Sequence, residues 1–246
     1  KSISHEHGKI NSKIVSKQII STVFLTILTL LTMESQAQTF KTIENKDLKL
    51  EVYNASENSF GVASVIVSGK KDAVLIDTQF TLADAEKVAQ EIKKSGKKLT
   101  TIFVSHGDPD FYFGLEVFKK YFPEVTAYAT PATIEHIKAT AQKKLDVWGE
   151  RLGKNITSNV ILPQVLKGNS IELEGHHLEI VGLQEFPSQT FVWIPSIKAV
   201  VGGINVFGTT FHLWMADAQT TEARKNWISV LDKITALNPE IVIPAH

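Results

Sequence analysis

The order of the apolar segments limits the fold of this chain more than any other feature of its sequence. Short apolar runs followed by stretches with helical spacing occupy residues 40–148, and the same order returns over residues 160–243. Short β-branched runs bounded by turn residues predict strands, and apolar residues spaced three and four apart predict helices. Two successive sets of strands and helices predict two sheets packed face to face, with helices outside. The predicted fold class is α+β, a four-layer αββα sandwich.

The boundaries of these elements follow from residues that begin or end regular structure. Residues 69–72 form a turn signal between two apolar runs, which predicts a β-hairpin. Gly96 and Pro123 end two predicted helices, and Pro131 begins a third, because proline fits the first helical turn. The predicted strands are residues 40–53, 62–67, 73–76, 101–104, 125–129, 160–162, 170–173, 178–181, 190–194, 199–201 and 241–243, and the predicted helices are residues 82–92, 115–122, 131–148 and 221–237.

Composition excludes several classes of function. The 246 residues are 43% hydrophobic and 21% charged, which is typical of a globular protein that buries a large core. The 26 Lys and Arg residues balance 26 Asp and Glu residues, so no excess of basic charge favours a nucleic acid as partner. The sequence contains no cysteine, which excludes disulfides and thiolate metal ligands. It also lacks a Gly-x-Ser-x-Gly motif, so a serine nucleophile of that kind is not indicated.

Residues 1–37 have the pattern of a leader followed by a secretory signal peptide. Two lysines precede an apolar, threonine-containing run at residues 19–31, and small residues precede the expected cleavage point after Ala37. A membrane anchor is the alternative, but this run is shorter than the roughly 20 residues that a spanning helix needs. We therefore expect a secreted or periplasmic domain over residues 38–246, with no membrane contact after cleavage. Because His246 directly follows an apolar run, we also expect the natural domain to continue beyond it.

The segment with most potential for chemistry is Ser-His-Gly-Asp-Pro-Asp-Phe-Tyr-Phe-Gly at residues 105–114. It lies between a predicted buried strand and a helix, and ligand sites favour such strand ends. His106, Asp108 and Asp110 alternate, so in an extended loop their side chains would point at one centre. The simpler interpretation is a strand-end turn, since Asp-Pro pairs favour turns and Asp side chains accept bonds from nearby amides.

Five segments in their order and spacing resemble the metallo-β-lactamase superfamily. They cover nearly all of residues 45–246, and the segments are 75–78 (Leu-Ile-Asp-Thr), 105–114, 191–196 (Phe-Val-Trp-Ile-Pro-Ser), 202–207 (Gly-Gly-Ile-Asn-Val-Phe) and 243–246 (Ile-Pro-Ala-His). That family carries His-x-His-x-Asp-His after such a strand and usually binds one or two zinc ions that activate water. The resemblance implies metal ligation by His106, Asp108, Asp110 and His246.

The sequence departs from the family pattern at several ligand positions. Asp108 replaces the second histidine, Phe111 the last histidine of the motif, Leu183 the third metal histidine and Ile204 the bridging carboxylate. Four of the usual ligand positions, His106, Asp108, Asp110 and His246, therefore keep a side chain able to ligate, and three do not. A catalytic zinc ion takes about three protein ligands and a water. The expected cofactor is one divalent ion or none, and an oxygen-rich set would also suit Mn²⁺ or Fe²⁺ in place of Zn²⁺.

The resemblance also implies roles for residues around the motif. Asp110 is the expected catalytic residue, which orients a water molecule or takes its proton. Asp77 ends a predicted buried strand and is expected to support the site loop by accepting bonds from backbone amides. His212 and Trp214 are expected at the rim of the cleft, where substrate contact and simple packing both remain open.

Two functions follow as hypotheses. The first is a hydrolase, in which activated water attacks an ester, lactone or amide of a small-molecule substrate. Asp108 and Asp110 could also act without metal, since two close carboxyl groups push their pKa values apart. The second is a non-catalytic, metal-free secreted binding module. Retention of His106, Asp108, Asp110 and His246 favours the enzyme. The apolar replacements Phe111, Leu183 and Ile204 favour the binding module.

Overall fold

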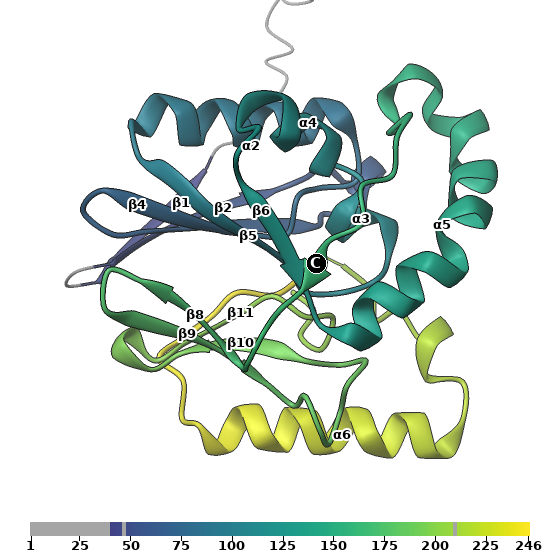
Figure 1. Cartoon of the computed structure of the whole chain (residues 1–246). Coiled ribbons are helices and arrows are strands. Elements are labelled where there is room, and N and C mark those ends of the chain that lie inside the picture. Colours follow the sequence, from purple (N-terminus) through teal and green to yellow (C-terminus); the bar gives the residue numbers. More distant parts are fainter. Residues whose placement is uncertain (1–39, 46–47, 209–210) are drawn as a thin grey trace, which may run out of the picture. The chain divides into compact units, whose positions relative to one another are not determined.

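A computed structural model of the chain describes residues 40–45, 48–208 and 211–246. These residues form two facing sheets with helices on their outer sides (Figure 1). The predicted leader and signal peptide, residues 1–37, lie outside the described residues, so secretion stays a prediction. Within the described part of the chain, no helix is both long enough and apolar enough to cross a membrane.

The first sheet has seven strands in sequential order. They are β1 (Lys41–Asn45), β2 (Leu48–Asn54), β3 (Ala63–Ser68), β4 (Asp72–Ile76), β5 (Lys98–Val104), β6 (Thr126–Ala129) and β7 (Gln164–Val165). Strands β1 to β4 pair antiparallel, and β4 to β7 pair parallel. The predicted hairpin at residues 69–72 is confirmed, since β3 and β4 pair antiparallel across it.

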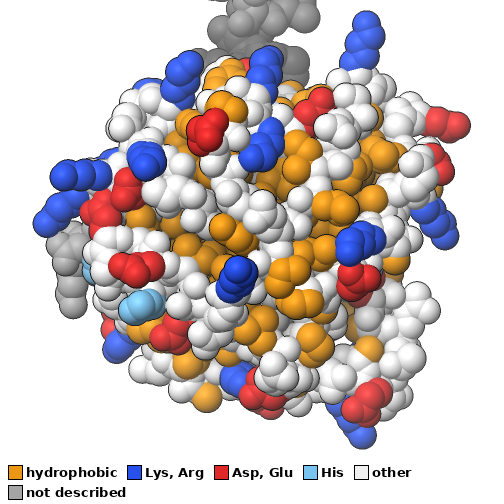
Figure 2. Space-filling view, in the orientation of Figure 1, with side chains coloured by type: hydrophobic (Ala, Val, Ile, Leu, Met, Phe, Trp, Pro, Cys, Tyr) orange, Lys and Arg blue, Asp and Glu red, His pale blue; other side chains and the backbone are white. Residues whose placement is uncertain are grey.

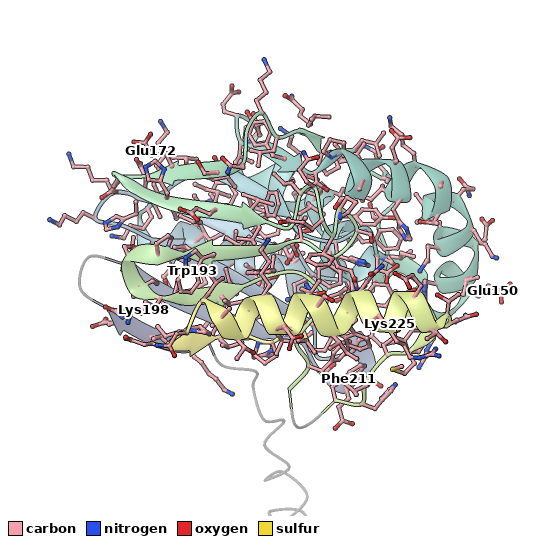
Figure 3. All side chains as sticks on the ribbon, turned by 90° about the horizontal axis from the view of Figure 1, so that it is seen from below. Glu150, Glu172, Trp193, Lys198, Phe211 and Lys225 are labelled. Atoms are coloured by element: carbon pink, nitrogen blue, oxygen red, sulfur yellow. The ribbon has the colours of Figure 1, made fainter. Side chains whose placement is uncertain are left out.

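The second sheet has five strands in the order β12-β11-β10-β9-β8. They are β8 (Ser170–Leu173), β9 (His176–Val181), β10 (Phe191–Ile194), β11 (Ala199–Val201) and β12 (Ile241–Val242). All its pairs are antiparallel except β11 with β12, because helix α6 (Thr221–Ala236) connects those two strands. Helix α6 runs along the outer face of this sheet (Figures 1 and 3).

Helices α2 (Leu82–Ser95) and α4 (Leu115–Tyr121) cover the outer face of the first sheet. Thr81 caps the start of α2, and Gly96 ends it in the left-handed conformation that glycine adopts without steric cost. Helix α5 (Pro131–Leu152) stands at the end of the sandwich. The remaining helices are short, namely α3 (Pro109–Tyr112), η1 (Glu57–Ser59), η2 (Gly153–Asn155), η3 (Pro195–Ile197) and η4 (Ala216–Ala218).

Alternation along the strands separates three apolar layers. On β4, Leu75 faces the helices whereas Val74 and Ile76 face the other sheet. On β10, Val192 lies between the sheets and Trp193 packs toward α6. Period-two alternation places both faces of each strand in a core, which requires a layer on either side of each sheet. The predicted four-layer αββα sandwich is therefore confirmed.

Three local predictions differ from the structure. Residues 40–53 form two strands, β1 and β2, which pair with each other. The predicted strand at residues 160–162 is wrong, because pairing with β6 begins only at Gln164. The loop at residues 105–114 is not extended throughout. Pro109 occupies the first helical turn and begins α3, so the predicted alternation of side chains ends at Asp108.

Candidate functional site

The site lies where β5 ends and the chain enters α3, against the inner face of α5. Gly107 allows this close approach, because a Cβ atom there would come within 2.7 Å of the His136 ring on α5. The side chains of Asp108 and Asp110 are nearly buried, with residue exposures of 9% and 7%. Two buried carboxyl groups require compensation, since an unpaired charge away from water is costly. Asp108 and Asp110 pair with different side chains.

Three basic side chains, His106, His136 and Lys144, surround Asp108. We call these four residues the Asp108 cluster. The ammonium Nζ of Lys144 donates to Asp108 Oδ1 at 2.9 Å. His136 Nε2 lies 3.6 Å from the same oxygen, and His106 Nδ1 lies 3.7 Å from Oδ2. Burial alone would raise the pKa of Asp108, but its three partners hold that pKa well below the usual range. Asp108 is therefore a carboxylate.

Asp110 pairs instead with an imidazole, and we call these two residues the Asp110–His246 pair. His246 Nε2 lies 3.4 Å from Asp110 Oδ2, and His246 Nδ1 lies 2.9 Å from the Phe60 carbonyl oxygen. A carbonyl only accepts, so Nδ1 carries a proton and orients the ring. Burial and the nearby Asp108 raise the pKa of Asp110 well above its usual value, and burial lowers that of His246. The neutral form of the pair is thus favoured.

The ring of Phe111 separates the two groups. It is fully buried, and its centroid lies 5.2 Å from that of His106 and 5.8 Å from that of His246. Both contacts are edge-on, which is a favoured geometry for aromatic rings. An apolar ring therefore stands at the centre of the predicted metal site.

Asp77 lies behind the site loop. Its Oδ1 accepts from the Ser105 amide at 2.7 Å and its Oδ2 accepts from the Ser105 hydroxyl at 2.6 Å. Ser105 Oγ in turn accepts from the Gly203 amide at 2.7 Å. Burial raises the pKa of Asp77 to about 7, against the lowering effect of these hydrogen bonds. The chain of bonds joins the loop after β5 to the loop after β11, and it supports the position of the site.

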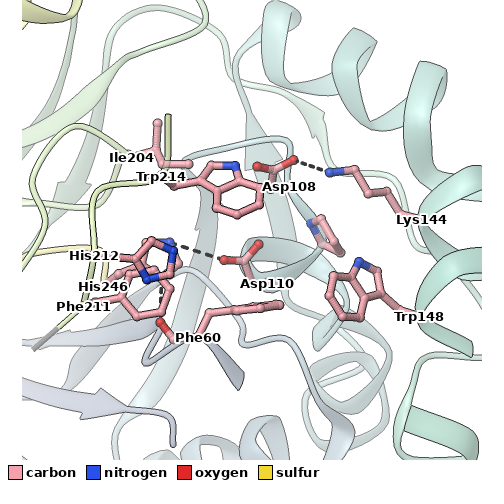
Figure 4. Close-up of a pocket in the computed structure, with 11 residues that line it drawn as sticks. Phe60, Asp108, Asp110, Lys144, Trp148, Ile204, Phe211, His212, Trp214 and His246 are labelled. Atoms are coloured by element: carbon pink, nitrogen blue, oxygen red, sulfur yellow. Dashed lines mark hydrogen bonds and ion pairs between the residues drawn. The ribbon is translucent and has the colours of Figure 1, made fainter. Parts of the chain in front are cut away.

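A cavity of about 250 Å³ opens on both carboxyl groups (Figure 4). Most of its wall is apolar or aromatic. The lining residues are Phe60, Asp108, Pro109, Asp110, Lys144, Trp148, Ile204, Phe211, His212, Trp214 and His246. Ligand pockets typically measure roughly 300–1,000 Å³, so this one fits a small molecule.

The structure brings most of the predicted site residues to this cavity. Asp108, Asp110 and His246 line it, and His212 and Trp214 lie at its rim as largely exposed side chains. His106 lies behind Asp108, and burial lowers its pKa to about 4 despite the opposing effect of Asp108.

Sequence reasoning missed the contribution of α5. His136, Lys144 and Trp148 are spaced by multiples of four, which places them on one helix face. That signal was present in the sequence, but it does not tell which face meets the site. Phe60 and Phe211 were also missed, because both come from irregular loops far away in sequence.

The predicted ligands do not fit a metal ion well. A catalytic zinc site takes about three ligands around one centre. Here Asp108 and Asp110 have separate partners, and the ammonium of Lys144 occupies one oxygen of Asp108. Throughout residues 40–45, 48–208 and 211–246, no three His, Asp or Glu side chains are arranged to hold an ion. The prediction of one bound ion is not confirmed.

Facing sheets with a pocket at their strand ends define the αββα class of hydrolase-like folds. A model of the metallo-beta-lactamase superfamily matches residues 58–192, more than half of the chain, and the chain belongs to that superfamily. No curated protein matches its sequence.

Solved structures show the same fold. A metallo-beta-lactamase from Pontibacter korlensis is 19% identical with a TM-score of 0.61, over 85% of this chain and 91% of that chain. The metallo-beta-lactamase IND-7 is 18% identical with a TM-score of 0.62, over 87% and 92%. The metallo-beta-lactamase DIM-1 is 19% identical with a TM-score of 0.57, over 85% and 89%. At these identities the likeness concerns the fold alone.

Proposed function

We propose that this hydrolase-like chain binds a small, flat, largely apolar carbonyl compound and hydrolyses it through the Asp110–His246 pair, without a cluster of metal ions. The observation that carries the proposal is the position of this pair at the wall of an aromatic cavity. A concave, mostly apolar pocket with a few converging polar groups is the usual form of an enzyme site. The metal-dependent reaction expected from the sequence has weaker support, because the donor set does not converge.

The proposed step uses one water molecule. The pair holds one proton between Asp110 Oδ2 and His246 Nε2. As the water oxygen bonds to the carbonyl carbon, the carbonyl oxygen takes the π electron pair and one water proton passes to the second oxygen of Asp110. The shared proton moves fully onto His246 Nε2 at the same time. The bond to the leaving alkoxide then breaks, and the proton returns to that alkoxide. The carbonyl of Phe60 keeps His246 oriented throughout, as a third group does in other acid–base sites.

The test uses two fragment-sized aromatic substrates, the ester 4-nitrophenyl acetate and the lactone dihydrocoumarin. Wild type should hydrolyse at least one of them faster than buffer does, and equally fast after dialysis against a chelator. Asp110→Asn and His246→Gln should each lose about 100-fold or more, since acid–base catalysis contributes roughly 10²–10⁴-fold. His177→Gln, which alters a histidine on β9 away from the cavity lining, is the matched control. Full activity of Asp110→Asn would refute the catalytic role.

A binding module without catalysis is the second candidate. The observation that favours it is that the charged groups of the cavity already have partners within the protein, which leaves mainly aromatic surface for a ligand. Trp148 and Trp214 line the cavity, so quenching of tryptophan fluorescence by 4-nitrophenol would report binding directly. Saturable quenching that Trp148→Leu weakens, without hydrolysis of either substrate, would support this second function.

A further inference from the structure

Lys144 lines the cavity and pairs with the carboxylate of Asp108. Within the described ranges it is the only Lys or Arg side chain paired with a carboxyl group of the cavity. It projects from α5, eight residues after His136 and therefore on the same face of that helix. Its side chain keeps one third of its surface exposed, whereas that of Asp108 keeps 12%. The ammonium group of Lys144 thus reaches the nearly buried carboxylate of Asp108 from the wall of the cavity (Figure 4).

An ammonium group and a divalent ion would compete for the same oxygen. Metal–oxygen bonds to zinc measure about 2.0–2.2 Å, and the Nζ atom already lies 2.9 Å from Asp108 Oδ1. Both charges on one carboxylate would repel each other strongly in a site with little water. Exchange of the lysine for an ion would also require the long α5 side chain to leave the cavity.

The other donors of the cluster give an ion little compensation for that exchange. His106 Nδ1 accepts from the Asp108 amide at 3.2 Å, so its lone pair is occupied within the loop. His136 Nε2 lies on the same side of Asp108 as the ammonium, next to Oδ1. Phe111 blocks the path from the cluster toward His246. With Lys144 present, the negative charge of Asp108 is therefore neutralised and its oxygen hydrogen-bonded without a metal ion.

We propose that Lys144 is the resident cation of this site, and that it excludes divalent metal ions from Asp108. The proposal is independent of which molecule the cavity binds and of whether the Asp110–His246 pair is catalytic. Whether this member of the superfamily binds a metal ion would then depend on a residue of α5 as well as on the motif. Removal of the lysine charge should then let a divalent ion bind weakly at Asp108, with His136, whose Nε2 lies 3.6 Å from Asp108 Oδ1, as the second donor.

The experiment measures metal binding and not hydrolysis. Full-length wild type, Lys144→Met, Lys144→Arg and the control Lys143→Met are purified without chelators and titrated with Co²⁺ and Zn²⁺. Isothermal calorimetry gives affinities, and the visible absorption of bound Co²⁺ reports its coordination. Lys143 is exposed and neighbours Lys144 on α5, so its substitution changes the net charge equally without touching Asp108.

We expect Lys144→Met to bind about one ion per chain at least tenfold more tightly than wild type. Lys144→Arg and Lys143→Met should behave as wild type does, and Asp108→Asn added to Lys144→Met should abolish the gain. Equal affinities of wild type and Lys144→Met, whether tight or undetectable, would overturn the proposal. If Lys144→Met does not fold, Lys144→Gln replaces it, because glutamine keeps a donor for Asp108 while lacking the charge.

Discussion

Asp108 and Asp110 are two residues apart and similarly buried, yet the fold places them in opposite electrostatic environments. Asp108 meets an ammonium group at 2.9 Å and stays ionised. Asp110 meets a neutral imidazole at 3.4 Å, and its pKa is raised. Burial is common to both, so burial alone does not decide the charge of a carboxyl group. The partner decides it, and here the partners come from opposite sides of the cavity, α5 for Asp108 and the chain after β12 for Asp110.

This comparison suggests a division of roles. An ionised carboxylate with a fixed lysine is suited to holding structure and excluding ions. A carboxyl group with a raised pKa beside an imidazole is suited to moving protons at neutral pH. In the superfamily pattern that the sequence resembles, both positions would serve metal ions, with a histidine in place of Asp108. Here the two aspartates have different partners, and the Phe111 ring lies between His106 and His246. Each of the predictions below tests how independent the two environments are.

Substitution of the separating ring should have the largest effect. Phe111→Ala removes a fully buried ring, and such changes cost about 3–5 kcal/mol of unfolding free energy through lost burial and a residual cavity. Urea unfolding measures the loss. Phe118→Ala, also fully buried in the same core cluster, should lose a similar amount. Only Phe111→Ala should also change quenching of cavity tryptophans by 4-nitrophenol. A loss below about 1 kcal/mol for Phe111→Ala would show that the ring does not separate two rigid groups.

Acidification should have the next largest effect, through His106. Its pKa falls from 6.5 to about 4 on folding, because burial disfavours the charged imidazole. At His106 the unfolded chain therefore binds the proton more readily, so the contribution of this residue to stability is full above pH 6.5 and declines as pH falls toward 4. A shift of this size corresponds to about 3 kcal/mol. Asp77, whose pKa is raised to about 7 on folding, contributes in the opposite direction over the same range. Stability curves in urea at several pH values measure the decline.

The matched variant is His106→Gln, which cannot be protonated in this range. The free energy of unfolding of wild type relative to that of His106→Gln should fall by about 3 kcal/mol between pH 6.5 and pH 4, because Asp77 is common to both proteins and cancels in this difference. The ring proton signals of His106, followed by NMR, should show no titration until the pH approaches 4. Titration near 6.5 would contradict the burial that the structure gives this imidazole.

The fold was largely predictable from the sequence, and the site only in part. Strand alternation and the end signals at Gly96, Pro123 and Pro131 depend on neighbours a few residues away, so they are visible in one chain. The error at residues 160–162 arose because strand formation there depends on pairing with β6. Such pairing is a tertiary contact that local pattern does not contain.

The site shows the same limit more sharply. The motif residues His106, Asp108 and Asp110 were identified because they lie together in sequence. Lys144 was not, since it lies 36 residues from its partner and resembles any solvated helix lysine. The separation of Asp108 from Asp110 depends on α3, which begins at Pro109 and turns the two side chains apart. Ligand identity can be inferred from a motif, whereas the electrostatic partner depends on the packing of a distant helix.

The ion pair between Lys144 and Asp108 should contribute less than the core ring or the buried imidazole. A double-mutant cycle of Lys144→Met and Asp108→Asn should give a coupling of about 1–2 kcal/mol, because contact is direct but one third of the lysine side chain meets solvent. The same cycle with Lys143→Met should give no coupling. A zero value for Lys144 would mean that Asp108 is neutral or is compensated by its histidines, and the contrast between the two aspartates would disappear.

Substitution of His136 should have the smallest effect on the free energy of unfolding. The experiment shows whether His136 or Lys144 compensates the charge of Asp108. Its Nε2 atom is 3.6 Å from Asp108 Oδ1, longer than a hydrogen bond, and 44% of its side chain is exposed. A long contact with one exposed partner contributes less than about 1 kcal/mol, so His136→Gln should leave urea unfolding almost unchanged. Added NaCl should reduce even that difference, because salt screens exposed charges. If His136→Gln cost as much as Lys144→Met, the compensating charge would be shared along the face of α5. Exclusion of metal ions would then be a property of that helix face and not of one lysine.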